Sequence, residues 1–345
     1  MDSVPIFVGL DYHSGSVQAC VVDAAGKVLL NSKREPSVLD VVRAVEPFGV
    51  VQRVAIEACS GAADFGDHVA RETGWRVSLS HPGLVSKMRS SIDKSDRSDA
   101  RVLADLCRTG YLPEVWLPPE PIRELRTMVR RRHQITDSMR CAKVRIAALL
   151  RNNRVPTPEE IVTRWTRKHI AWLKAVKLSV ALRAVMNDLL AELEFHARCR
   201  DALDASLEEL TAGDAMIARL LEIKGIGLVT AWTLRAVIGR FDRFRNGKQL
   251  SRYCGLTPKN ASSGERVADA GLVRACDPTL KVVLLQVIHR VVRLAGEWNR
   301  LYLGFLERGK PRSVAVAAVA NRWTRRLWHD LKGMGDGGPV LTAVA

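Results

Sequence analysis

The sequence lacks paired cysteines, long hydrophobic runs and a balance of charge. Its seven cysteines are scattered over 345 residues with no C-x-x-C pair, which argues against a disulfide framework and a structural zinc site. No uninterrupted apolar segment reaches about 18 residues, so we expect no transmembrane helix. The first residues, Met-Asp-Ser-Val-Pro, show no secretory signal pattern. These absences together predict a reduced, cytoplasmic protein that does not use a membrane.

Acidic residues are too few to balance the basic ones. The chain has 37 Asp and Glu against 53 Lys and Arg, a formal net charge of +16. A protein this basic needs a polyanionic partner or a reason to tolerate self-repulsion, and nucleic acid is the commonest such partner. A basic surface kept only for solubility is the alternative. We therefore expect a nucleic-acid-binding protein, and its length suits two or three domains.

The first part of the chain, residues 1–115, alternates short β-rich runs with helical stretches. Helical patterns occur at 37–45 and 62–73, and strand patterns occur at 6–11, 17–23, 27–31, 51–57 and 75–79. Three strands in hairpin contact, followed by α-β-α-β, is the element order of an RNase H-like domain. Such a domain is a mixed sheet with helices on both faces, so this region is expected to be α/β.

The middle region, residues 116–215, has a strongly basic helical pattern. From Arg123 to Arg154 the chain has ten Lys and Arg against two acids. Like charges at i,i+4 destabilise a helix unless something neutralises them, which favours phosphate binding over a merely solvated face. The candidates are Arg130, Arg131, Arg132, Arg140, Lys143 and Arg145. A second helical stretch at about 176–210 predicts an antiparallel hairpin, a coiled-coil arm.

The last region, residues 216–340, is expected to be mainly helical, with a loop near 255–273 and helices at about 278–294 and 314–331. Lys224, Gly225 and Gly227 lie in a tight turn between two helical patterns. Backbone amides of such a turn can meet a phosphate, as in helix-hairpin-helix elements. A plain helix turn is the alternative.

Four carboxylates lie at positions that suit a metal site. Asp11 and Glu57 end the first and fourth predicted strands, which are neighbours in an RNase H-like sheet, and Asp96 and Asp99 share one helix face. Asp96 as a helix N-cap is the alternative. Converging carboxylates repel each other unless a cation lies between them. Mg²⁺ prefers oxygen ligands, and two such ions can support phosphodiester cleavage.

Three segments carry a resemblance to a known family: Gly-Leu-Asp at 9–11, Ile-Glu-Ala at 56–58 and Lys-Ser-Asp-Arg-Ser-Asp-Ala at 94–100. Together they resemble the DEDD transposases of the IS110 (IS-one-ten) family. The N-terminal domain of that family is similar to the Holliday-junction resolvase RuvC. The resemblance implies a RuvC-like domain whose catalytic magnesium ligands are Asp11, Glu57, Asp96 and Asp99.

The second half resembles the C-terminal transposase domain of the same family. The shared pattern is the Gly-Ile-Gly turn, Gly-Leu-Thr-Pro at 255–258, a Ser-Gly pair at 263–264, and Gly309-Lys310 before a small-residue helix. It implies Ser263 as a nucleophile that joins covalently to DNA, with Ser262 as the less favoured neighbour, and Lys310 as a nucleic-acid contact. One departure is Lys281, where the family often has arginine. Lysine keeps the charge but loses the bidentate fork.

The resemblance implies a bacterial transposase, or site-specific recombinase, that cleaves and rejoins DNA during insertion-sequence transposition. It also implies a structured, bridge-type guide RNA, element-end and target DNA, two Mg²⁺ ions, and work at the nucleoid. Because recombination involves two duplexes, a homo-dimer or tetramer is expected. One alternative is a RuvC-like junction-resolving nuclease, whose activity would survive loss of Ser263. The other is a non-catalytic nucleic-acid-binding protein, which would bind without magnesium.

The histidines and tryptophans show no functional spacing. His13 lies two residues from Asp11; it is interpreted as a surface histidine, and contact with substrate is the alternative. Trp165 and Trp172 lie seven residues apart, a spacing typical of core or coiled-coil packing rather than base stacking.

Overall fold

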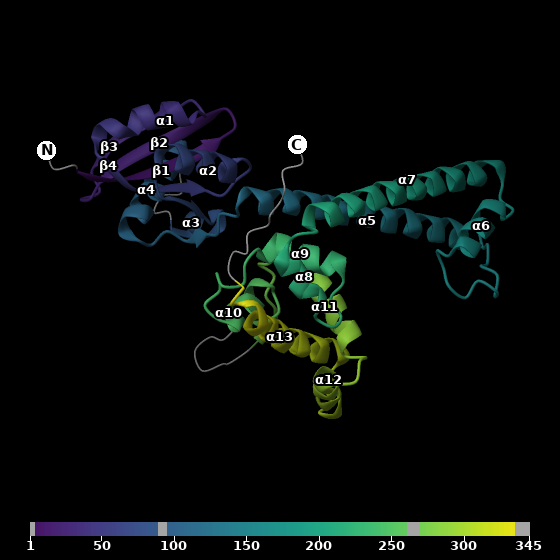
Figure 1. Ribbon diagram of the computed structural model, residues 1–345. Helices are drawn as coiled ribbons and strands as arrows, with labels where there is room; N and C mark the ends of the chain where they lie inside the picture. Colours follow the sequence, from purple (N-terminus) through teal and green to yellow (C-terminus); the bar gives the residue numbers. More distant parts are fainter. Residues whose placement is uncertain (1–3, 89–94, 261–268, 335–345) are drawn as a thin grey trace. The chain divides into compact units, whose positions relative to one another are not determined.

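The computed structural model describes residues 4–88, 95–260 and 269–334 (Figure 1). The chain divides into two compact units, Met1–Glu120 and Pro121–Ala345. The arm predicted at 116–215 and the helical region predicted at 216–340 share the second unit, and the division into three domains stays a prediction. Within the described residues, no helix is both long and apolar enough to cross a membrane.

The first unit is built on a six-stranded mixed sheet in the order β3-β2-β1-β4-β5-β6. Strands β1 and β2 pair antiparallel, as do β2 and β3, whereas β4 pairs parallel to both β1 and β5. The short β6 closes the edge antiparallel to β5. The strands are β1 (Pro5–His13), β2 (Ser16–Asp23), β3 (Val28–Arg34), β4 (Val50–Glu57), β5 (Val77–Ser80) and β6 (Glu114–Val115). The five predicted strands are confirmed, and β1 runs two residues beyond Asp11.

Helices cover both faces of this sheet. Inward residues of β1 such as Val8 and Leu10 pack with α1 (Val38–Val45) and α2 (Ala62–Thr73), and a 3-10 turn, Glu46–Phe48, leads into β4. The opposite face carries α3 (Pro82–Met88) and α4 (Asp96–Thr109), whose Ala100, Leu103 and Ala104 are fully buried. Because side chains alternate along a strand, Gly9, between Val8 and Leu10, faces α4. The α/β architecture predicted for this region is confirmed.

The second unit begins with a long helical hairpin (Figure 1). It consists of α5 (Glu120–Asn152), the short α6 (Arg167–Ala175) and α7 (Val180–Thr211). Arg132 of α5 pairs with Asp204 of α7, and Arg145, further along α5, pairs with Glu192, so the two long helices run antiparallel. The predicted hairpin is confirmed, whereas α6 was not predicted. It packs at the far end through Leu173, in a cluster with residues of α5 and α7.

The remaining helices form a core at the base of this hairpin. They are α8 (Ala215–Leu221), α9 (Leu228–Ile238), α10 (Gly247–Tyr253), α11 (Pro278–Val291), α12 (Glu297–Glu307) and α13 (Arg312–Leu331). Leu125 of α5 and Leu207 of α7 belong to this core, which explains why hairpin and core form one unit. A buried ion pair, Arg235 Nε to Asp214 Oδ2 at 2.7 Å, links α9 to the cap of α8. The region predicted as a loop contains a hairpin of β7 (Pro258–Asn260) and β8 (Asp269–Leu272).

Candidate active site

Asp11 and Glu57 occupy equivalent positions on neighbouring strands. The parallel register of β1 and β4 ends at the pair Leu10 and Ile56, so the next residue along each strand is one of these acids. Two residues earlier, Gly9 and Ala55 both face α4. Because strand side chains alternate between faces, both carboxylates project from the side of the sheet that α4 covers.

The first turn of α4 supplies the other two acids. Ser95 caps this helix: its side chain accepts a hydrogen bond from the Ser98 amide, and the Ser98 side chain bonds back to the Ser95 backbone. The alternative interpretation of Asp96 as the N-cap is therefore wrong. Asp96 is the first helical residue, with its side chain 58% exposed, and Asp99 is buried one turn later. The positive end of the helix dipole stabilises both charges.

A glycine sets how closely α4 approaches β1. A Cβ atom at Gly9 would collide with the carbonyl oxygen of Ala100 and the amide nitrogen of Ala104. The helix backbone thus lies directly on the strand, two residues before Asp11 and one turn after Asp96. This close approach holds the two carboxylates together.

Replacing Gly9 with alanine should therefore force α4 away from β1. We expect a loss of about 1–3 kcal/mol of stability, the usual range for overpacking, and the loss of any Tm increase on adding Mg²⁺. Gly15→Ala is the matched control because a Cβ there meets nothing within 4 Å. Thermal unfolding with and without Mg²⁺ measures both effects. Equal behaviour of the two variants would contradict the role assigned to Gly9.

His13 joins the acids, although it was not among the predicted metal ligands. Its Nε2 lies 3.5 Å from Asp11 Oδ2 and 3.9 Å from Asp96 Oδ1. One ligand atom from each of these three residues lies within 4.8 Å of the others. His13 is exposed, as its interpretation as a surface histidine predicts, and it also belongs to this cluster. Glu57 and Asp99 flank the cluster without contributing to this set of atoms.

The environment of Asp11 disfavours its charge. Burial raises the pKa of the Asp11 carboxyl above its ordinary 3.8, His13 opposes this shift, and the charges of Asp96 and Asp99 raise the pKa further. These interactions place both acids of α4 within electrostatic reach of Asp11. Such mutual repulsion is what a bound cation would relieve.

The raised pKa of Asp11 predicts a stability effect with a definite sign. The folded state binds the Asp11 proton more tightly than the unfolded state, so this contribution to stability is full below pH 3.8 and is lost as pH rises through the raised pKa. Asp11→Asn should therefore raise the Tm at pH 7 in EDTA by about 1–3 °C. The increase should be smaller at pH 5. A Tm lowered by the substitution at pH 7 would contradict this.

The thiol of Cys59 lies within electrostatic reach of both Asp11 and Glu57. Cys59 Sγ donates a hydrogen bond to the Tyr12 carbonyl oxygen at 3.3 Å. Burial raises the pKa of this thiol, and the charges of Asp11 and then Glu57 raise it further. Cys59 is therefore protonated at neutral pH, and its environment places the charges of both strand acids near one thiol.

The serines implied as nucleophiles, Ser262 and Ser263, lie outside the described residues. The strands on either side of them, β7 and β8, form a hairpin whose base is anchored. The Val273 amide donates to the Thr257 carbonyl, and Lys281 Nζ donates to the Val273 carbonyl at 3.2 Å. Asn321 of α13 donates to the Leu256 carbonyl. Lys281, the departure from the family pattern, thus supports this hairpin directly.

The basic residues predicted to bind nucleic acid differ in exposure and in their ion-pair partners. Arg130 and Arg131 are exposed on α5. Arg140 pairs with Asp137 at 3.3 Å with both side chains exposed, and exposed pairs of this kind are weak enough to exchange for phosphate. Lys310 is exposed just before α13.

Three further predicted contacts, Arg132, Arg145 and Lys143, have partners within the helical hairpin. Arg132 is largely buried and makes a bidentate pair with Asp204, so we assign it to joining α5 and α7. Arg145 pairs with Glu192 at 3.3 Å but stays mostly exposed. Lys143 lies with its Nζ 5.3 Å from the ring centroid of Trp165.

The glycine turn joins α8 to α9. Gly225 has a positive φ of 94°, and a Cβ there would collide with the Val291 side chain of α11. Gly227 starts α9, which has no side-chain cap, and Lys224 beside it is exposed. Uncapped amides next to a lysine suit an anion, as the sequence predicts.

Comparisons with known proteins match both halves of the chain. A sequence model named for the DEDD transposases of IS110, described as "Transposase", matches residues 8–153. A second, described as "Transposase IS116/IS110/IS902 family", matches residues 217–303. The first range contains Asp11, Glu57, Asp96 and Asp99, and the second contains the glycine turn and Ser263.

Similar proteins align along nearly the whole chain. A "Probable family 20 transposase" of Pseudomonas aeruginosa is 28% identical, covering 93% of this chain and 95% of its own length. The "Transposase for insertion sequence element IS1111A" of Coxiella burnetii is 23% identical, with 93% and 88% covered. The transposase for IS1328 of Yersinia enterocolitica is 24% identical, with 93% and 95% covered.

The two matched ranges together span more than half of the chain. The relatives named as transposases align with it over almost their full lengths. The chain belongs to the IS110 family of insertion-sequence transposases, enzymes that catalyse DNA strand transfer.

Proposed function

We propose that this transposase cleaves and rejoins DNA through a magnesium-dependent acidic site formed by Asp11, Glu57, Asp96 and Asp99. The observation that supports it most strongly is the cluster in which ligand atoms of Asp11, His13 and Asp96 lie within 4.8 Å of one another. Asp99 acts electrostatically on Asp11, and Glu57 follows the last register pair of β1 and β4.

The donor set suits a hard divalent cation. Carboxylate oxygens dominate it, as Mg²⁺ prefers, and the imidazole of His13 is also compatible with Mn²⁺. Two bound ions would supply charge stabilisation for the attacking and leaving oxygens of a phosphodiester. The strand acids are fixed by the sheet, and the helix acids by the close packing of α4 at Gly9. His13, with its side chain 56% exposed, can contact a DNA phosphate.

We assign the first unit to the RNase H-like, RuvC-like class. The support is its strand order, an antiparallel β3-β2-β1 meander continued by parallel β4 and β5. Acids at the ends of two central strands and on the helix packed across them are arranged as that class requires.

We propose Ser263 as the nucleophile. Its Oγ would bond to the scissile phosphorus, its proton would pass to a base, and a sugar hydroxyl of the DNA would leave. Rejoining is the reverse, with a DNA hydroxyl displacing the serine. This assignment is supported by the hydrogen bonds that hold Leu256 and Val273, at the base of the β7–β8 hairpin.

The partners proposed are element-end and target DNA, a bridge-type guide RNA and further copies of this chain. The exposed cations of α5 and Lys224 beside the uncapped α9 suit phosphates of either nucleic acid. Because recombination must hold two duplexes, the proposed assembly is a dimer or tetramer. Its proposed place of work is the bacterial nucleoid.

The proposal is tested with purified full-length protein, labelled element-end DNA and RNA transcribed from the flanking element. We expect strand cleavage with Mg²⁺ and none in EDTA. Cleavage unaffected by EDTA would overturn the metal site. Tight binding with no cleavage under any divalent cation would favour the non-catalytic alternative.

A further inference from the structure

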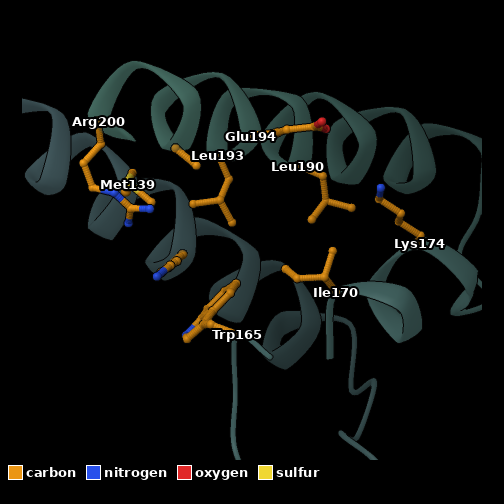
Figure 2. A pocket seen from close by; sticks show the side chains of 10 residues that line it. Met139, Trp165, Ile170, Lys174, Leu190, Leu193, Glu194 and Arg200 are labelled. Carbon is orange, nitrogen blue, oxygen red and sulfur yellow. The ribbon is translucent and has the colours of Figure 1, made fainter. Parts of the chain in front are cut away.

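A pocket lies near the far end of the helical hairpin, between α5, α6 and α7 (Figure 2). Its volume is about 330 Å³, which lies at the lower end of the range for small-ligand sites. Leu190 and Leu193 project into it from α7, and Ile170 projects from α6 on the other side. We call it the tip pocket. It is far along α5 from the core helices and contains none of the acids of the candidate active site.

Basic side chains surround the tip pocket. Lys143, Lys174 and Arg200 all line it, against a single lining acid, Glu194. Both Glu194 and Arg200 have neighbours: Glu194 pairs with Arg198, and Arg200 with Asp201. Lys174 has no ion-pair partner among the described residues. A net positive, partly apolar pocket favours a ligand with a flat apolar part and a negative charge.

Trp165 supplies an aromatic wall. Its backbone φ is +67°, a left-handed conformation that is rare for a bulky residue and is typical of ligand clamps. The Trp165 amide donates to His169 Nδ1 at 2.9 Å, and its indole meets the His169 ring edge-on. His169 in turn stacks on Trp172. Trp165 and Trp172 therefore both pack against the hydrophobic cluster at this end of the hairpin, as their spacing predicts, and Trp165 also lines the pocket.

Trp165 also lines a second pocket. Its volume is about 290 Å³, and its lining includes Arg151, Arg164 and His169. Because His169 Nδ1 accepts a hydrogen bond, the ring proton of the neutral imidazole is on Nε2. That Nε2 is buried without a hydrogen-bond partner among the described residues. Cations therefore line both pockets beside the indole, and the His169 ring that it contacts carries an unused donor.

We propose that the tip pocket binds an unpaired nucleotide of a single-stranded nucleic acid. The base stacks on Trp165 against the apolar residues of α7, and its flanking phosphates contact Lys174 and Arg200. The Lys143 ammonium, which covers the indole at 5.3 Å, moves from the ring to a phosphate as the base enters. An aromatic face ringed by cations is the usual platform for single strands. This inference rests on the proposed use of nucleic acid but is independent of the acidic site.

The test uses the full-length protein and fluorescence anisotropy with labelled oligo(rU) and oligo(dT). Trp165→Leu should weaken binding about five- to fiftyfold, as expected when one base loses its stacking partner, and Trp165→Phe should retain most of it. Lys174→Ala should lower the slope of log affinity against log salt by about one. Lys177→Ala is the matched control, because Lys177 is exposed nearby and does not line the pocket.

A photocrosslinking arm locates the contact independently of total affinity. Oligonucleotides carrying 4-thiouridine or 4-thiothymidine should crosslink within residues 139–200, and Trp165→Leu should remove this crosslink while circular dichroism stays unchanged. Stronger crosslinking of one oligonucleotide identifies RNA or DNA as the source of the nucleotide. Wild-type affinity and crosslinking in Trp165→Leu would overturn the proposal. The Asp11→Asn variant should crosslink normally, so failure of the acidic site and failure of the tip pocket give different results.

Discussion

Replacing Asp11 with asparagine should reduce Mg²⁺-dependent cleavage of element-end DNA by more than about a hundredfold. Loss of a residue that only orients a metal ligand costs about 10–100-fold, and Asp11 is proposed to bind the metal itself. Asparagine preserves the shape of the side chain and removes its charge. The cluster with His13 and Asp96 would then lose the carboxylate that the other two residues surround. Denaturing gels of labelled DNA measure the effect.

Two controls make this result specific. Glu72→Gln changes an exposed acid on α2 of the same unit and should leave cleavage unchanged. Binding of DNA and RNA by Asp11→Asn should stay within about threefold of wild type, because the basic residues of the second unit are intact. Cleavage by Asp11→Asn close to the wild-type rate would contradict the metal site.

Replacing Ser263 with alanine should abolish the covalent protein–DNA adduct. The bond between Oγ and phosphorus cannot form without the hydroxyl, whereas metal binding by the acids is unaffected. The adduct is seen as a slowly migrating labelled band that survives denaturation and disappears on proteolysis. Ser262→Ala is the matched control and should still form it.

The outcome also separates the competing mechanisms. An adduct lost only in Ser262→Ala would transfer the nucleophile to the neighbouring serine. Cleavage without any adduct, unchanged in Ser263→Ala, would contradict serine chemistry and support the junction-resolving nuclease.

The acidic site could be predicted because strand periodicity and strand order are local signals. Parallel neighbours end at the same edge of a sheet, so Asp11 and Glu57 could be placed together from sequence alone. The i,i+3 spacing of Asp96 and Asp99 likewise required only the helical repeat. The Ser95 cap was harder, because Ser, Asp and Asn are nearly equivalent at that position.

The membership of His13 had a signal that was not used. Asp11 and His13 are two residues apart on one strand, which places them on the same face, but the prediction ended the strand at Asp11. The contact of Gly9 with the backbone of α4 had no such signal, because it depends on how a helix packs on a sheet. The same holds for the pairing of Arg132 with Asp204, since residues 72 positions apart meet only in the folded hairpin.

Trp165 shows a further limit of spacing arguments. The seven-residue spacing predicts core packing for Trp165 and Trp172, and both pack against the same hydrophobic cluster, although Trp165 precedes α6 with a positive φ. Its backbone conformation turns the indole toward the tip pocket. Trp172 lies on α6, and the spacing gave no sign that Trp165 would also line a pocket.

Divalent cations held by Asp11, Glu57, Asp96 and Asp99 can be located by replacing Mg²⁺ with Fe²⁺ and mapping hydroxyl-radical cleavage of the polypeptide. We predict backbone cuts near residues 11–13, 57–59 and 95–99 that excess Mg²⁺ suppresses and Asp11→Asn removes. Cuts at other places only, or the same cuts in Asp11→Asn, would contradict the claim.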